Sequence, residues 1–375
     1  MRKVYYCYTD EYSKVSFGEE HPFKPYRLIL AYELSKAYNL FEDVNIEKPE
    51  MCPLSELEKV HDKHYLYVLN KCNNGKEMPE AFFYNLGTAD NPIFEGMYDW
   101  SSRVCGASLN GAKKLCEKSA DIYFNIAGGM HHAMPEKASG FCYLNDAAVA
   151  INYLLDCGKK VAYIDIDAHH GDGVQKIFYS TSKVLTISLH ESGRFLFPGT
   201  GFEYEMGEGE GEGFAVNIPM FPAADDENYL RAFFEIVPPL LNAFQPDVIV
   251  TQLGVDSLYN DPLATLNLTT CAFERIVAYF YSLNLPWLAL GGGGYNVANV
   301  ARAWTLAVAI MTEREIKDPI PATVLPIFER FKVKLNSLRD DVVVKDESLQ
   351  ERINRETSRV IEKLKKHLFP YHHLY

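Results

Sequence analysis

Short apolar runs alternate with segments of helical periodicity from about residue 120 onward, and this alternation restricts the fold more than any other feature. The apolar runs span 121–127, 160–167, 183–189, 214–220, 247–254 and 286–290. The helical patterns span 143–157, 173–180, 226–244, 270–283 and 296–312. Because the runs are apolar on both faces, they are typical of strands buried in a parallel sheet. The alternation predicts an α/β fold with a mostly parallel central sheet flanked by helices on both faces.

The two ends of the chain carry more helix than strand. In the N-terminal part we expect one strand followed by helices, including 25–38 and 55–72, and no linker rich in Gly, Ser or Pro separates them from the sheet. The C-terminal part is charged and ends in a helix-like stretch at 347–367. We therefore expect a main domain over 1–312, with a C-terminal helical extension over 313–375 packed on the same domain.

Charge and cysteine content exclude several classes of protein. The net charge is −13, and no run of Lys or Arg occurs, so we expect no nucleic-acid partner. The first residues lack the apolar core of a secretory signal, and no apolar stretch approaches the ~18 residues of a membrane span. No Cys-x-x-Cys pair occurs, which excludes a zinc site of that type. We expect a cytoplasmic protein with reduced thiols, and the oligomeric state stays open.

The segment DIDAHHGDG, residues 165–173, is the strongest candidate for chemistry. Asp165 and Asp167 share one face of the predicted strand, and His169 continues this spacing at the strand end. A carboxylate and an imidazole two residues apart can bind one metal ion, and so many polar groups would be costly to bury without a cation. The alternative is a solvated acidic turn with a helix cap, which does not explain the apolar strand leading into it.

Asp256 is the candidate for a third metal ligand. A catalytic zinc site typically uses three protein ligands and leaves one position open. Asp256 follows the apolar run 247–254, so it would lie at the same edge of a parallel sheet as Asp167 and His169. Taken alone, Asp256 would be interpreted as a turn or helix cap. The three residues together form an oxygen-rich set that suits Zn²⁺, and Fe²⁺ or Co²⁺ would also fit.

A pair of histidines follows another apolar run. His131 and His132 stand in GGMHHA, on a loop made flexible by glycine. Histidine is the side chain best suited to move protons near neutral pH, and Asp165 and Asp172 are spare carboxylates that could orient the two rings. A lone histidine here would more often be structural, but a pair beside a candidate metal site favours acid–base chemistry.

A glycine-rich loop, LGGGGY at 290–295, follows the last apolar run. Four glycines could indicate a phosphate-binding loop, yet the Lys-Ser/Thr of such a loop is missing. The alternative is a loop that lets the backbone approach a ligand and presents Tyr295, whose hydroxyl could donate a hydrogen bond to a developing oxyanion. The pattern on its own does not decide between the two.

Six motifs taken together resemble the histone deacetylase superfamily. They are, in order, GGMHHA, ASGFCYLND, DIDAHHGDG, FPGTG, QLGVDS and LGGGGY, and they lie within 125–295. A weaker similarity reaches HPFKPYR around Arg27. The resemblance is closest to the class I-like branch, which includes bacterial deacetylases of the acetoin-utilisation type. It implies an arginase/deacetylase-like fold, with 1–312 as the catalytic domain, and metal-dependent removal of acyl groups from lysine side chains in proteins.

The resemblance also implies roles for individual residues. The residues that match catalytic positions are His131, His132, Tyr295, Asp165 and Asp172. Those that match the metal ligands are Asp167, His169 and Asp256. Those that match the walls, rim and interior of the substrate channel are Asp90, Gly140, Phe141, Phe197, Leu263, Gly293 and Arg27. Those that match two potassium sites are Asp165, Asp167, His169, Ser188 and Leu189 for one, and Phe178, Thr181, Val184 and Phe214 for the other.

By the same resemblance, His132 takes a proton from the attacking water, His131 tunes the electrostatics, and Tyr295 polarises the scissile carbonyl. Which histidine performs which proton transfer stays open. Arg27 matches an arginine of the inner cavity linked to acetate release. Two departures concern Met130, which replaces a tryptophan common in eukaryotic members, and the loop 87–92, which is one residue longer than usual and bears on the assignment of Asp90 as a clamp on the substrate backbone.

Three alternatives stay open at this stage. An arginase-like binuclear manganese hydrolase needs bridging carboxylates, but Leu258 stands where a second acid would follow Asp256. A non-catalytic protein that binds acyl-lysine would not need Tyr295 or the histidine pair. A deacetylase of acetylpolyamines or other small acetylated amines would have an acidic gate, for which Asp90 or Glu95 could serve. The expected partners are thus acetylated proteins or peptides, with small acetylated amines as the alternative.

Overall fold

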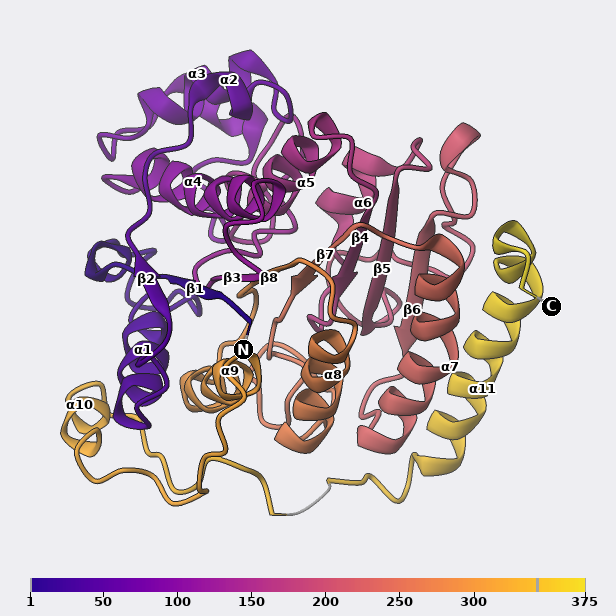
Figure 1. Ribbon diagram of the computed structural model, residues 1–375. Coiled ribbons are helices and arrows are strands. Elements are labelled where there is room, and N and C mark those ends of the chain that lie inside the picture. Colours follow the sequence, from indigo (N-terminus) through magenta and orange to yellow (C-terminus); the bar gives the residue numbers. More distant parts are fainter. Residues whose placement is uncertain (1, 342–343, 375) are drawn as a thin grey trace.

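An eight-stranded sheet forms the centre of the protein, and in the part of the chain that is described all its strands pair in parallel (Figure 1). The computed structural model describes residues 2–341 and 344–374. The strands are β1 (Val4–Cys7), β2 (Asn45–Glu47), β3 (Ile122–Asn125), β4 (Val161–Asp165), β5 (Val184–Glu191), β6 (Ala215–Met220), β7 (Val248–Gln252) and β8 (Trp287–Leu290). The expected α/β fold with a parallel sheet is confirmed.

Each predicted apolar run contains one strand, because a strand that is buried on both faces needs apolar side chains at every position. In β3, β4, β6, β7 and β8 every residue is buried. The short strand β2 was not predicted. It lies at the edge of the sheet and its residues are partly or fully exposed, so no apolar run marks it.

Helices cover both faces of the sheet (Figure 1). They are α1 (Arg27–Ala37), α2 (Leu54–Leu57), α3 (Lys63–Lys71), α4 (Met97–Cys116), α5 (Asp146–Asp156), α6 (Asp172–Phe178), α7 (Asp226–Phe244), α8 (Thr270–Ser282), α9 (Val297–Met311), α10 (Leu325–Arg330) and α11 (Gln350–His367). The helices α4, α5 and α6 lie on one face, and α1, α7, α8 and α9 lie on the other.

The prediction of a single helix over 55–72 was wrong. Two helices, α2 and α3, occupy this stretch. The side chain of Asp62 accepts hydrogen bonds from the backbone N–H groups of His64 and Tyr65, each 2.9 Å long, and thereby caps the start of α3. Such a cap needs extended backbone at Asp62, so it interrupts the helix.

The strand order β2-β1-β3-β8-β7-β4-β5-β6 places β7 beside β4, although α6, β5, β6 and α7 lie between them in sequence. From β4 the chain winds outward to β5, whereas from β7 it winds in the opposite direction to β8. Between β4 and β7 the winding direction therefore reverses. In open parallel sheets the crevice at the carboxyl ends of such strands is where ligands bind.

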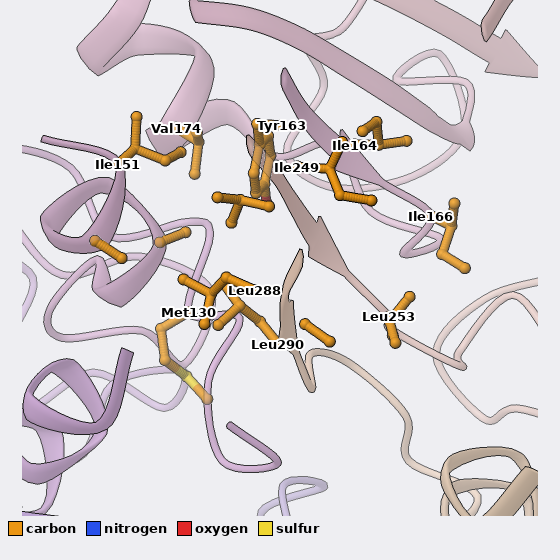
Figure 2. Packing of buried hydrophobic residues seen from close by; sticks show 14 of the residues in the cluster. Met130, Ile151, Tyr163, Ile164, Ile166, Val174, Ile249, Leu253, Leu288 and Leu290 are labelled. Carbon is orange, nitrogen blue, oxygen red and sulfur yellow. The ribbon is translucent and has the colours of Figure 1, made fainter. Parts of the chain in front are cut away.

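One large apolar cluster joins the sheet to its helices. Figure 2 shows part of it, with Tyr163 and Ile164 of β4, Ile249 of β7, Ile151 of α5 and Val174 of α6. Alternate residues of β4 point to opposite faces, so Tyr163 and Ile164 pack against different layers. Burial on both faces holds the strand ends in place, and the polar residues that follow them are therefore rigidly positioned.

The C-terminal part of the chain packs on the same sheet and helices. Helix α11, yellow in Figure 1, contacts α7 and β6. Residues Val324, Phe328, Leu335 and Leu338 form a second apolar cluster with α1 and α9. Each of the eight cysteines has a free thiol. In the described part of the chain, none of the helices combines the length and apolar character needed to cross a membrane.

Candidate active site and metal centre

Three buried side chains converge where β4 and β7 end. Asp167 and His169 follow β4, and Asp256 follows β7. Each offers a potential ligand atom, and these atoms lie within 4.8 Å of one another. His169 Nδ1 is 3.2 Å from Asp167 Oδ1 and 2.9 Å from Asp256 Oδ2. The structure thus brings together the residues that the sequence nominated as metal ligands.

The chemistry of this group fits a divalent cation. Two carboxylates and an imidazole are almost completely buried here, with exposures of at most 7%. Burial and the neighbouring charge of Asp167 raise the pKa of Asp256 to about 7. Buried carboxylates this close repel each other unless a positive charge lies between them. The Asp-His-Asp group could therefore bind a metal, as the histone deacetylase resemblance implies.

The carboxylate of Asp167 is fixed by its neighbours. Gln252 Nε2 and the backbone N–H of Gly293 both donate to Asp167 Oδ2, at 2.6 and 2.7 Å. A Cβ atom at position 293 would lie 2.2 Å from Asp256 Oδ2, so only glycine allows this approach of the backbone. The loop LGGGGY therefore brings its backbone against the candidate metal ligands, which is the second of the two interpretations that the sequence left open.

Each of the two adjacent histidines is hydrogen-bonded to a carboxylate. The Nδ1–H of His131 donates to Asp165 Oδ2 at 2.8 Å, and the Nδ1–H of His132 donates to Asp172 Oδ1 at 2.7 Å. Tyr163 O–H also donates to Asp165 Oδ2, at 2.6 Å. These bonds orient the two rings so that their Nε2 atoms face each other.

The Nε2 atoms of His131 and His132 are 3.1 Å apart. Two nitrogens at this distance must share a proton, so the pair carries one positive charge when both Nδ1 atoms are protonated. Burial alone would lower the pKa of His131, but Asp165 and Asp167 raise it to about 9. Burial and the charge of His131 lower the pKa of His132. The charge therefore resides on His131, whose Nε2–H donates to the Nε2 lone pair of the neutral His132.

Tyr295 lies beside His169 and Phe141 in the same site. Its backbone N–H donates to Asp261 Oδ2 at 2.7 Å, which fixes the end of the glycine loop. The Tyr295 ring lies 5.7 Å from that of Phe141 and 6.4 Å from that of His169, both edge to face. Burial raises the pKa of the Tyr295 hydroxyl well above its ordinary value, so the group keeps its proton and can donate a hydrogen bond.

A channel of about 210 Å³ leads from the surface to these groups. Its lining residues are Asp90, His132, Gly140, Phe141, His169, Leu196, Phe197, Leu263 and Tyr295. The ring of Phe197 lies 5.0 Å from that of His132. A Cβ atom at Gly140 would lie 2.4 Å from His132 Cδ2, so a larger residue there would displace the histidine. A long, mainly apolar chain with a polar end is the shape that fits this channel.

The comparisons with known proteins agree with this geometry. A family model for the histone deacetylase domain matches residues 21–311. Histone deacetylase clr6 of Schizosaccharomyces pombe is 36% identical over 367 residues, covering 97% of this chain and 90% of that protein. Histone deacetylase 1 of Homo sapiens is 38% identical over 376 residues, covering 98% of this chain and 74% of that protein.

A solved structure is similar as well. The crystal structure of a histone deacetylase homologue from Aquifex aeolicus aligns with a TM-score of 0.85 and 33% identity, covering 95% of this chain and all of that one. The chain belongs to the histone deacetylase family. The resemblance drawn from the six motifs is confirmed, and membership of the family supports deacetylase activity.

In this histone deacetylase family member, Arg27 supports the glycine loop. Its guanidinium is buried and donates to the carbonyl oxygens of Gly294 and Gly292, at 2.7 and 2.6 Å. An inner cavity of about 20 Å³ lies beyond the channel, and Met130, Phe23 and both histidines are among its lining residues, but Arg27 is not. The structure therefore places Arg27 behind the backbone that contacts the candidate metal ligands.

The residues nominated for potassium lie at two ends of the sheet. Asp165 and Ser188 are paired neighbours in β4 and β5, and Leu189 follows Ser188. Phe178, Thr181 and Val184 lie between the end of α6 and the start of β5, where the N–H of Thr181 donates to the carbonyl of Phe178 at 3.3 Å. Phe214 precedes β6, and its carbonyl accepts from Thr186 N–H. Potassium binding itself stays a prediction.

Several residues that hold the candidate site in place were not predicted from the sequence. Asp146 accepts hydrogen bonds from the backbone N–H groups of Gly129 and Met130, at 3.0 and 2.8 Å, and so shapes the loop before the histidines. Asp261 likewise accepts a hydrogen bond from the backbone N–H of Tyr295, whereas Gln252 donates from its side-chain amide to Asp167 Oδ2. A polar residue within a buried apolar run, as at Gln252, was the only sequence signal available, whereas Asp261 lies in a loop without a pattern.

Proposed function

We propose that this protein is a metal-dependent lysine deacetylase that hydrolyses the amide of acetylated lysine side chains in proteins, with Zn²⁺ as the metal. One observation carries the proposal. A proton-holding histidine pair, a buried Asp-His-Asp group and a protonated tyrosine all meet at the inner end of one apolar channel. This combination suits a neutral amide on a long aliphatic stem.

When bound by Asp167, His169 and Asp256, a divalent cation supplies a Lewis acid that polarises a carbonyl and lowers the pKa of water. His132 then accepts a proton from the attacking water at Nε2, because its Nδ1–H is already held by Asp172. The Tyr295 hydroxyl donates a hydrogen bond to the oxyanion that develops on the substrate. The C–N bond breaks as the lysine nitrogen takes up a proton from the histidine pair.

His131 provides a constant positive charge during these proton transfers. As an imidazolium tied to Asp165, it faces the developing negative charge and stays charged while His132 gains and loses its proton. The walls formed by Phe141 and Phe197 exclude water and hold the methylene chain of the side chain. Asp90, which also lines the channel, would accept hydrogen bonds from the substrate backbone.

A substrate panel tests the proposal. Metal-free enzyme is reloaded with Zn²⁺, Fe²⁺ or Co²⁺ and assayed with acetyl-lysine peptides, longer acyl-lysine peptides and acetylspermidine. We expect acetyl-lysine peptides to have the highest kcat/KM and Zn²⁺ to restore activity. Faster turnover of acetylspermidine would shift the substrate class to small amines. Peptide binding without release of acetate with any of the three metals would contradict the enzymatic proposal altogether.

A further inference from the structure

The segment between β5 and β6 forms one wall of the channel. Leu196 and Phe197 in this segment line the channel directly. Phe197 is 45% exposed, and its ring faces both His132 and His169. Because a half-exposed aromatic ring is not held by burial alone, its position depends on how the segment 192–207, here named the wall segment, is anchored.

Two anchors attach the wall segment to the interior of the protein. His170 Nδ1 lies 2.8 Å from the hydroxyl of Thr200, and His190 Nε2–H donates to the carbonyl of Gly201 at 2.8 Å. Thr200 and Gly201 lie shortly after Phe197 in sequence. The ends of the wall segment are also tied to β6, because Ser192 N–H donates to the carbonyl of Met220 at 2.8 Å and Asn217 Nδ2 donates to the carbonyl of Glu205 at 3.0 Å.

The outer anchor comes from the C-terminal helix. Glu203 is only 7% exposed, and its Oε1 accepts hydrogen bonds from Arg359 Nη1 at 2.5 Å and Lys363 Nζ at 2.7 Å. Arg359 and Lys363 lie one turn apart on α11. Burial would raise the pKa of Glu203, but Lys363 and Arg359 hold it at about 2, so the ion pairs persist at neutral pH.

An indirect contact through Phe221, the residue after β6, also links the two elements. The ring of Phe195 packs edge to face on that of Phe221, at 5.4 Å between centroids, and the guanidinium of Arg352 on α11 lies 4.6 Å from the Phe221 ring. Helix α11 therefore contacts the wall segment directly at Glu203, and only through Phe221 on the N-terminal side of Phe197. The histone deacetylase domain match ends at residue 311, so α11 lies outside it.

We propose that α11 positions the Phe197 wall of the channel through the buried Glu203, and thereby sets how tightly the acyl-lysine stem is bound. Glu203, Arg359 and Lys363 are positioning residues, since they act through Leu196 and Phe197. The inference rests on the proposed lysine deacetylase function. Its physical basis is that a buried carboxylate deprived of both cations is destabilised, and a shift of the wall segment toward water relieves this cost.

The test compares two double variants of α11. R359Q/K363Q removes both partners of Glu203, whereas K365Q/K366Q removes two charges one turn further along the same helix. Lys365 pairs with Glu235 of α7 and does not reach the wall segment. In R359Q/K363Q we expect KM for a short acetyl-lysine peptide to rise roughly tenfold, with kcat changed less than about twofold, because the wall contributes to binding in ground and transition state alike. In K365Q/K366Q both constants should match the wild type.

A rescue variant separates positioning from general stability. Adding E203Q to R359Q/K363Q removes the uncompensated charge, so most of the lost affinity should return. Wild-type KM in R359Q/K363Q, or an equal rise in K365Q/K366Q, would overturn the inference. Such a result would leave the lysine deacetylase proposal intact.

Amide hydrogen exchange provides a readout that needs no turnover. The N–H groups of Leu196 and Gly199 donate within the wall segment, to Ser192 and Leu196. They should exchange faster in R359Q/K363Q than in K365Q/K366Q. Unchanged exchange would contradict the inference. If the wild-type enzyme turns over no acyl-lysine peptide, the proposed function is wrong. The exchange measurement still shows whether α11 holds the wall segment in place.

Discussion

At the scale of single residues, the proposed mechanism gives the hydroxyl of Tyr295 a defined task. It keeps its proton because burial raises its pKa, and it faces the channel beside His169. We expect Tyr295→Phe to lower kcat by about a hundred- to a thousandfold, the usual cost of one lost oxyanion donor. Steady-state kinetics with an acetyl-lysine peptide would measure this. An unchanged kcat would remove Tyr295 from the mechanism, provided that circular dichroism shows an intact fold.

The sequence predicts individual site residues well when their chemistry is carried by side chains. Asp167, His169 and Asp256 come together as expected, because each follows a buried strand and parallel strands end at the same edge. The supporting contacts were not predictable to the same degree. Gly293 acts through its N–H and its missing side chain, and a run of four glycines does not reveal which of them approaches a carboxylate.

At the scale of secondary-structure elements, His61 links the start of α5 to the loop after the histidine pair. Its Nε2 accepts from the backbone N–H of Asn145 at 2.9 Å, and its Nδ1–H donates to the carbonyl of Met134 at 3.0 Å. Burial lowers the pKa of His61 from its ordinary 6.5 to about 4. The folded state thus requires neutral imidazole, since a second ring proton would break the bond from Asn145.

This requirement predicts an acid-sensitive fold. As the pH falls below 6.5, His61 becomes protonated in the unfolded chain but stays neutral in the folded protein until about pH 4. The free energy of unfolding therefore decreases between these two pH values. At about pH 5, this one residue lowers the free energy of unfolding by about 2 kcal/mol. His61→Gln keeps an acceptor and a donor but does not titrate. Urea unfolding at about pH 7.5 and pH 5 should show a smaller loss for the variant, and equal losses would exclude His61 as the cause.

The elements themselves were predictable where burial is uniform. Each apolar run after residue 120 contains a strand, and the helical pattern over 226–244 coincides with α7. The prediction of one helix over 55–72 was wrong because the cap at Asp62 interrupts the helix, although the apolar spacing continues. The long helix α4 was not identified by its boundaries, and the exposed edge strand β2 leaves no apolar pattern to detect.

At the scale of the whole molecule, the candidate ligands link two segments that lie far apart in sequence. His169 and Asp256 are 87 residues apart, yet both belong to one buried group. A cation bound only in the folded state stabilises that state by mass action, by about 4 kcal/mol at a thousand times Kd. Removing the metal with a chelator should therefore lower Tm by several degrees, and Zn²⁺ should restore it.

Asp256→Asn is the control for metal removal, because its Tm should respond much less to chelator or Zn²⁺. Elemental analysis of the loaded wild type should give one metal per chain, whereas two per chain would favour an arginase-like site. An equal Tm with and without chelator, for wild type and variant alike, would contradict a metal held by these residues.

The alternation of strands and helices predicted the class of fold, because burial and chain connectivity allow few other arrangements. It did not predict the order of the strands. Nothing in the sequence of β7 and β8 indicates that they insert between β3 and β4, and this insertion creates the crevice that holds the site. The attachment of α11 to the wall segment was also not foreseen, because a single glutamate in a loop rich in Glu and Gly carries no pattern.

The pairing of β4 with β7 has a consequence for the quality of any preparation of this protein. Asp165 is opposite Gln252 in the native register, and a slip by one residue would turn every side chain of the shifted strand to the other face. Only chains with the correct register can then present all three candidate ligands to an ion. If zinc is the metal, as proposed, the zinc retained per chain after loading and removal of loosely bound ions would measure the fraction of correctly assembled molecules.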